Sequence, residues 1–158
     1  MSDTTETAIL AGGCNWIMQQ LLRYPEGVIS TRIGFMGGYG ENPTEKDSGG
    51  HAEVVEVIFD PERLTYRGLL ELFFVTHRAD LDESVVGSLY RSEIFCTSPE
   101  QRRVAEAMIR DVDAAEHWLG KTVTRVSDAG VFWELGPEHQ DYLQRFPNVS
   151  PPPFPSVS

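Results

Sequence analysis

The chain is poor in cysteine: Cys14 and Cys96 are its only two, and they lie far apart in the sequence. A disulfide framework of the kind that stabilises small secreted domains is therefore excluded. No apolar run approaches the length of a membrane span. The polar, acidic N-terminal residues have neither the basic nor the apolar part of a secretory signal. Together these absences predict a protein of the reducing cytoplasm.

Basic residues are also scarce: 13 lysines and arginines stand against 24 aspartates and glutamates, which gives a net charge of −11. A charge of this sign and size argues against nucleic acid and anionic membranes as partners. The histidines and cysteines show no spacing that is typical of a metal site, so no metal is expected. The remaining composition, 41% hydrophobic over 158 residues, fits one globular domain with a sizeable core.

The order of the predicted elements indicates a single α+β domain over residues 1–158. β-branched and apolar residues predict strands over 7–11, 28–35, 52–59, 90–96 and 122–128. Apolar residues at helical spacing predict helices over 15–24, 66–78, 99–115 and 137–146, with loops at 36–51 and 79–87. This order predicts a mixed sheet with packed helices around a split βαβ, ferredoxin-like core. The ends, 1–6 and 148–158, are expected to be loosely ordered or extended.

Cys14 is the first candidate for chemistry, because it lies where a predicted strand and two glycines give way to a helix. Helix N-termini carry unpaired N–H groups and a partial positive charge. We therefore expect the pKa of this thiol to fall and its sulfur to become a nucleophile. The alternative is a small apolar residue that fills a gap in the core.

Glu53 is the second candidate, since it opens a strand face that is otherwise formed by valine and phenylalanine. If that face packs inward, desolvation raises the pKa of the carboxyl and makes it a general acid near neutral pH. The alternative is a frayed strand end, at which the carboxylate meets water. His51, which leads from the glycine-rich loop into Glu53, is assigned to the same pocket.

Two aromatic residues are candidates for the walls of such a pocket. Trp16, two residues after Cys14, offers an apolar surface beside the thiol. Tyr90, at the start of a predicted strand, offers a hydroxyl group. Ordinary packing, in the core for Trp16 and on a half-buried strand for Tyr90, is the alternative for both.

Six short motifs occur in order along residues 7–147 and carry a family resemblance. They are Ala11-Gly12-Gly13-Cys14-x-Trp16, Gly34-x-x-Gly37-Gly38, Asn42-Pro43-Thr44, Ser48-Gly49-Gly50-His51-Ala52-Glu53-Val54, Tyr90-Arg91-Ser92 and His139-Gln140-Asp141-Tyr142. Together they resemble the A-type peptide-methionine (S)-S-oxide reductases.

The resemblance implies a thiol-dependent reduction of a methyl sulfoxide. Cys14 would attack the sulfoxide sulfur, and Glu53 would protonate the oxygen. Tyr90 would steady the oxygen and Trp16 would form a wall of the methyl pocket. The products would be a thioether and a sulfenic acid on Cys14, which a thiol can reverse. No prosthetic cofactor is implied, and the reductant would be an external thiol or a thioredoxin-like protein.

The chain departs from the family pattern at three positions assigned to the substrate pocket. Asn15 stands where the family has phenylalanine, Glu45 where it has tyrosine, and Val85 where it has aspartate. These changes imply methionine S-sulfoxide or a related, more polar small sulfoxide as substrate. A cysteine enzyme for another electrophile and a non-catalytic binding domain are the alternatives. No cysteine follows Cys96, which we expect to be structural, so the resolving cysteines of many relatives are absent.

Overall fold

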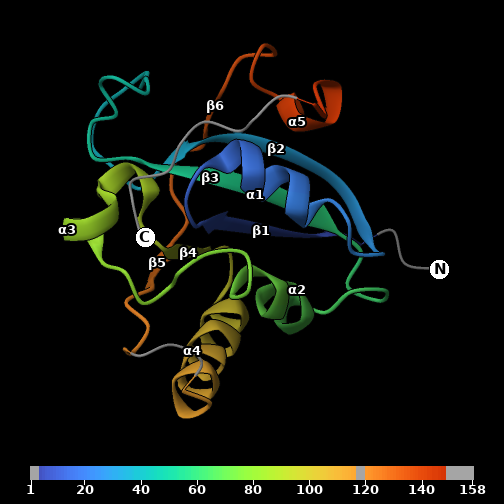
Figure 1. The fold of residues 1–158 in the computed structure, drawn as a ribbon. Helices are drawn as coiled ribbons and strands as arrows, with labels where there is room; N and C mark the ends of the chain where they lie inside the picture. The colour runs from blue at the N-terminus through green and yellow to red at the C-terminus, as the bar shows by residue number, and fades with distance from the viewer. Residues whose placement is uncertain (1–3, 117–119, 149–158) are drawn as a thin grey trace.

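A six-stranded mixed sheet in the order β5-β4-β1-β3-β2-β6 forms the frame of this computed structural model (Figure 1). The structure describes residues 4–116 and 120–148. The strands are β1 (Glu6–Ala11), β2 (Val28–Met36), β3 (Ala52–Phe59), β4 (Glu93–Cys96), β5 (Arg125–Asp128) and β6 (Trp133–Glu134). Neighbouring strands pair antiparallel, except β4 and β5, which are parallel.

The connections confirm the predicted α+β class. The helical segments are α1 (Asn15–Leu22), α2 (Tyr66–Phe73), α3 (Glu83–Val86), the 3₁₀ turn η1 (Ser88–Tyr90), α4 (Pro99–Ala114) and α5 (Tyr142–Arg145). Helix α1 joins β1 to β2, and β3 lies between these two strands and runs antiparallel to both. Helix α2 then joins β3 to β4, beside β1. This arrangement is the predicted split βαβ core.

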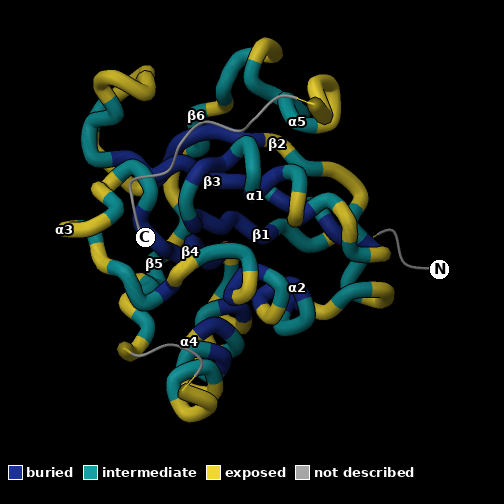
Figure 2. The backbone as a smooth tube through the Cα atoms, viewed as in Figure 1, coloured by how far each residue is buried: buried dark blue, intermediate teal, exposed yellow. Residues whose placement is uncertain are grey.

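The main hydrophobic core lies between the sheet and the helices α1, α2 and α4. Val55, Val57 and Phe59 of β3 are fully buried in it, as the alternation in the sequence predicted. Figure 2 shows that β3 is buried over most of its length. A smaller cluster on the opposite face contains Val54 of β3, against which Phe132 packs. Both faces of β3 are covered, so the side chains on these faces are desolvated. The side chain of Glu53 is one of them.

Several predicted elements are shorter in the structure than the sequence indicated. The helix predicted over 66–78 ends at Phe73, where the Thr76 hydroxyl donates to the Phe73 carbonyl oxygen and satisfies an orphan acceptor. The strand predicted over 122–128 begins at Arg125, and the helix predicted over 137–146 is confined to Tyr142–Arg145.

The region 79–96 differs most from the prediction. The loop predicted over 79–87 contains α3, whose N-cap Asp82 accepts a hydrogen bond from the Ser84 N–H. Gly87, with a φ of +83°, ends α3 in a conformation that strains other residues. Tyr90 therefore lies in η1 rather than at the start of a strand, and β4 begins only at Glu93.

The two predicted tails lie mostly outside the described residues, since 1–3 and 149–158 are not described. Glu6, which was assigned to the N-terminal tail, instead opens β1 opposite Phe59. In the described part of the chain, no helix has the length and apolar character that crossing a membrane requires.

Candidate active site

Cys14 lies at the N-cap of α1, directly after a tight glycine turn. Gly13 has a φ of +93°, and a Cβ at Gly12 would lie only 2.9 Å from Cγ and Nδ1 of the His77 ring, so both positions favour glycine. Cys14 is only 4% exposed, yet it lines a cavity of about 300 Å³. The sulfur is therefore enclosed by the fold but borders a space large enough for a small ligand.

Six parts of the chain contribute to this cavity. Its lining residues are Cys14, Asn15, Trp16, Phe35, Pro43, Thr44, Glu45, Glu53, Tyr90, Leu135, Glu138 and His139. Most of the predicted site residues are thus brought together, although they come from α1, the glycine-rich loop, β3 and η1.

Glu53 is 7% exposed, and its Oε1 accepts a hydrogen bond of 2.8 Å from the Asn15 N–H. Burial raises the pKa of this carboxyl to about 7, although the Asn15 N–H acts in the opposite direction and the nearby Glu45 adds to the rise. The sequence predicted this direction and its cause. Near neutral pH the carboxyl is therefore close to half protonated, and it can both donate and accept a proton.

The expected low pKa of Cys14 is wrong. Burial, followed by the negative charge of Glu53, raises the pKa of this thiol to about 11. The N–H groups of Ile17 and Trp16 lower it, as the helix-terminus argument predicted, but they do not outweigh the other two causes. The resting thiol is therefore protonated.

Asn15 and Trp16 fix the start of α1 and one side of the cavity. The buried Asn15 amide donates to the carbonyl oxygens of Gly34 at 3.2 Å and Val54 at 3.4 Å, which ties α1 to β2 and β3. The Trp16 ring stacks on Tyr142 with a centroid distance of 3.8 Å. Asn15 thus anchors α1 to the sheet at the position where the family resemblance implies an aromatic wall.

Two predicted pocket residues do not line the cavity. The ring of His51 is buried in the stem of the glycine-rich loop, where Nδ1 accepts from the Gly38 N–H and Nε2 lies 2.7 Å from the Gly40 carbonyl oxygen. Both ring nitrogens are thus used to close this stem. Val85 lies on α3 and is 46% exposed, because the chain forms a short helix within the segment that is predicted to be a loop.

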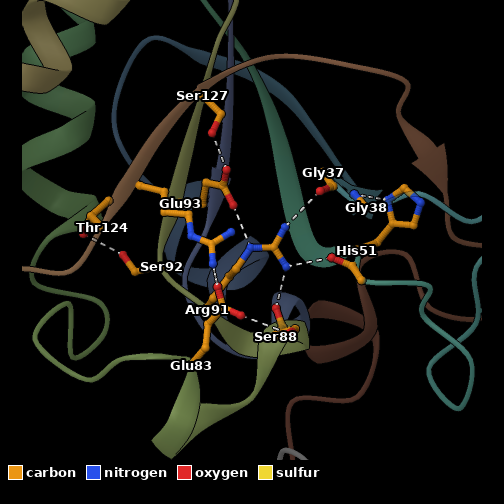
Figure 3. A network of polar contacts seen from close by, with 12 residues as sticks. Gly37, Gly38, His51, Glu83, Ser88, Arg91, Ser92, Glu93, Thr124 and Ser127 are labelled. Carbon is orange, nitrogen blue, oxygen red and sulfur yellow. Dashed lines mark hydrogen bonds and ion pairs between the residues drawn. The ribbon is translucent and has the colours of Figure 1, made fainter.

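A buried ion pair joins Arg91 and Glu93 (Figure 3). Both side chains are 4% exposed, and Arg91 Nε donates to Glu93 Oε1 at 2.7 Å. The second oxygen of Glu93 accepts from the Ser127 hydroxyl. The two buried charges therefore satisfy each other, with further hydrogen bonds on both sides.

The remaining donors of Arg91 hold the backbone of two segments that line the cavity. Nη1 donates to the carbonyl oxygens of Gly50 at 2.9 Å and Ser88 at 2.8 Å, and Nη2 donates to Gly37 at 3.3 Å. Gly37 and Gly50 flank the loop that carries Glu45, and Ser88 begins the turn that carries Tyr90. One guanidinium group therefore positions both segments.

Sequence reasoning missed the apolar side of the cavity, to which Phe35 and Leu135 contribute. Phe35 pairs with Glu53 across β2 and β3, so a predicted strand register would have found it. His139 belongs to a motif that was noted without a role. Within residues 4–116 and 120–148, no group of three or more histidine, cysteine or acidic side chains is placed to hold a metal ion.

The ion pair leads to a prediction about stability. We expect Arg91→Met to lower the free energy of unfolding by ~3–5 kcal/mol, because it leaves Glu93 buried without its cation. Arg91→Met combined with Glu93→Met should recover the part of that loss that comes from the unpaired carboxylate, while the hydrogen bonds from Arg91 to the backbone stay lost. Urea unfolding measures both variants. A single variant that costs less than ~1 kcal/mol, the usual value of an exposed pair, would contradict this account.

The charge of Glu53 leads to a prediction about thiol reactivity. In a Cys96→Ser background, the alkylation rate of Cys14 against pH should have a midpoint well above the ~8.5 of a free cysteine. Glu53→Gln should lower that midpoint, because it removes a negative charge beside the sulfur. Glu56→Gln, on the same strand, is the matched control and should leave the midpoint in place. A midpoint below 8.5 in the parent protein would show that the sulfur is already activated.

Comparisons with known proteins show the family to which this chain is similar. A family model described as peptide methionine sulfoxide reductase matches residues 6–151. The peptide methionine sulfoxide reductase MsrA of Nocardia farcinica is 54% identical over 151 residues, which cover 94% of this chain and 88% of that protein.

Solved structures show the same fold. The methionine sulfoxide reductase A of Corynebacterium diphtheriae is 28% identical, with a TM-score of 0.84 over 96% of this chain and 79% of that one. Reduced Mxr1 from Saccharomyces cerevisiae is 22% identical, with a TM-score of 0.86 over 96% and 91% of the two chains. The family model matches nearly the whole length of this chain, and the relative from Nocardia farcinica is 54% identical to it. This chain therefore belongs to the peptide methionine sulfoxide reductase family.

Proposed function

We propose that this protein reduces methyl sulfoxides, namely methionine S-sulfoxide or a related, more polar small sulfoxide, with Cys14 as nucleophile and Glu53 as proton donor. The observation that carries the proposal is that a thiol and a buried carboxyl with a pKa near 7 line one small cavity. The hydrogen bond from the Asn15 N–H to Glu53 links the two groups, because Asn15 directly follows Cys14. Membership of the family supports the same reaction.

In the first half-reaction, the Cys14 sulfur attacks the sulfoxide sulfur while Glu53 gives its proton to the sulfoxide oxygen. The S–S bond formed by this attack and the S–O bond of the substrate then break as an S–O bond forms on Cys14, which leaves a sulfenic acid on Cys14 and releases the thioether. The proton of the thiol returns to Glu53, so the carboxyl ends as it began. The substrate gains two electrons and the cysteine loses two.

The raised pKa of Cys14 fits this sequence of events. A protonated thiol is a poor target for unspecific oxidation, because the thiolate is the reactive form. The negative charge of Glu53 contributes to the raised pKa, so a neutral Glu53 removes that contribution. The N–H groups of Trp16 and Ile17 then favour the developing thiolate. When Glu53 has given its proton to the sulfoxide oxygen, its carboxylate takes the proton of the thiol, so attack is coupled to the presence of an oxygen that needs a proton.

The other lining residues hold the substrate. Burial, and then the charge of Glu53, raise the pKa of Tyr90, so its phenol keeps its proton and can donate to the oxygen. Trp16, Phe35 and Leu135 offer the apolar surface that an S-methyl group requires.

The sulfenic acid is resolved by an external thiol or a thioredoxin-like protein, without a prosthetic cofactor. Cys14 and Cys96 are both free thiols, and Cys96 lies buried in the core between the sheet and the helices, beside Tyr66. Free thiols fit the reducing cytoplasm as the place of action.

Turnover of sulfoxides with dithiothreitol tests the proposal. We expect reduction of free or peptide-bound methionine S-sulfoxide, with no turnover by Cys14→Ser and a loss of about 10²- to 10⁴-fold for Glu53→Gln. For the parent protein, kcat/KM should fall as the pH rises through about 7, because Glu53 then loses the proton that it donates.

A single turnover without reductant provides the control for the role of each cysteine. Dimedone should then label one sulfenic acid, on Cys14, and Cys96→Ser should give the same yield and the same steady-state rate. The proposal would be abandoned if no methyl sulfoxide in a panel of S and R forms were reduced.

A further inference from the structure

The cavity is lined by acidic side chains and by no basic ones among the described lysines and arginines. Glu45, Glu53 and Glu138 line it, whereas no lysine or arginine is found among its described lining residues. Neither Glu45 nor Glu138 forms an ion pair with a described arginine or lysine, and Glu138 has only His139, at 3.8 Å. The whole chain carries a net charge of −11, which adds to the same field.

Glu45 is the carboxylate that can act on a ligand. It is exposed to solvent and lines the cavity, so it lies at the rim. Its negative charge raises the pKa values of Cys14, Glu53 and Tyr90, and it therefore acts on every group at the reacting end. Glu41, on the same loop, neither lines the cavity nor contributes to these three shifts.

The loop that carries Glu45 is held at its base and at its tip. At the base, Arg91 and the His51 ring bind backbone atoms on both sides. At the tip, the N–H of Thr44 donates to the Asp47 carbonyl oxygen and the N–H of Asp47 donates back to Thr44, which closes a turn around Glu45. The position of this charge at the rim is therefore set by the fold.

We infer that Glu45 selects methyl sulfoxides that carry an ammonium group near the sulfoxide, and disfavours those with a carboxylate there. This inference rests on the proposed function, because it names the substrate class of the same site. Free methionine sulfoxide amide or an N-terminal methionine sulfoxide has such an ammonium group, which is mostly protonated at pH 7. A sulfoxide with a blocked amine and a free carboxylate has the opposite charge.

The size of the effect follows from the rim position. In a nearly aqueous setting, a unit charge at contact distance changes binding by a factor of about five, and less at larger separation. Because the cationic and anionic substrates shift in opposite directions, their kcat/KM values should differ by about tenfold. Salt should reduce this ratio, since the Debye length falls to ~3 Å at 1 M ionic strength.

Three derivatives of methionine S-sulfoxide test the inference: the amide, which is cationic, the N-acetyl amide, which is neutral, and the N-acetyl acid, which is anionic. We expect kcat/KM to fall in that order at low ionic strength. The cation-to-anion ratio should fall from about tenfold to below about threefold in Glu45→Gln. Glu41→Gln is the matched control and should keep the ratio of the parent protein.

The ratio is taken within one protein, so a changed thiol pKa in Glu45→Gln affects both substrates alike and cancels. Equal kcat/KM values for the cation and the anion, or a ratio that Glu45→Gln leaves unchanged, would overturn the inference while the proposed reaction stands. No turnover of any of the three derivatives would overturn the proposed reaction, and the inference with it.

Discussion

The hydrogen bond from the Asn15 N–H to Glu53 Oε1 is the contact on which the site depends. It joins Asn15, which is the first residue of α1 and follows Cys14 directly, to a buried carboxyl on β3 in the middle of the sheet. A carboxyl with no partner in this interior would cost several kcal/mol, on the order of a large part of the total stability of a domain. One N–H offsets part of that cost and lowers the pKa of the carboxyl, but burial outweighs it and the pKa stays near 7.

Burial acts on both reactive groups at once, and this links stability to function. The pKa of Glu53 is raised in the fold, so the native state holds its proton between about pH 4.5 and 7, where the unfolded chain has lost it. The fold therefore becomes less stable as the pH rises through this window. The same burial keeps the Cys14 thiol protonated. Burial of Glu53 thus lowers the stability of the fold near neutral pH, and it also keeps a proton available where the sulfoxide oxygen binds.

Local patterns predicted much of this architecture. The bounds of β3 and the burial of Glu53 followed from a two-residue period, which needs no knowledge of distant residues. The pKa of Cys14 did not follow, because the helix terminus is local whereas Glu53 and the surrounding core arrive by tertiary contact. Phe35 and Leu135 were not predicted for the same reason, because they too reach the cavity by tertiary contact. His51 and Val85 were wrongly assigned to the cavity. A motif specifies which residues are neighbours in sequence, whereas α3 and the stem of the glycine-rich loop determine which side chains reach the cavity.

The central claim is that Glu53 is close to half protonated at neutral pH and able to give its proton to a substrate. A ¹³C NMR titration of glutamate carboxyl groups, with Glu53→Gln to assign the signal, measures this directly. The account predicts a midpoint for Glu53 at about pH 7. A midpoint near 4.5, the ordinary value for a glutamate in water, would contradict it.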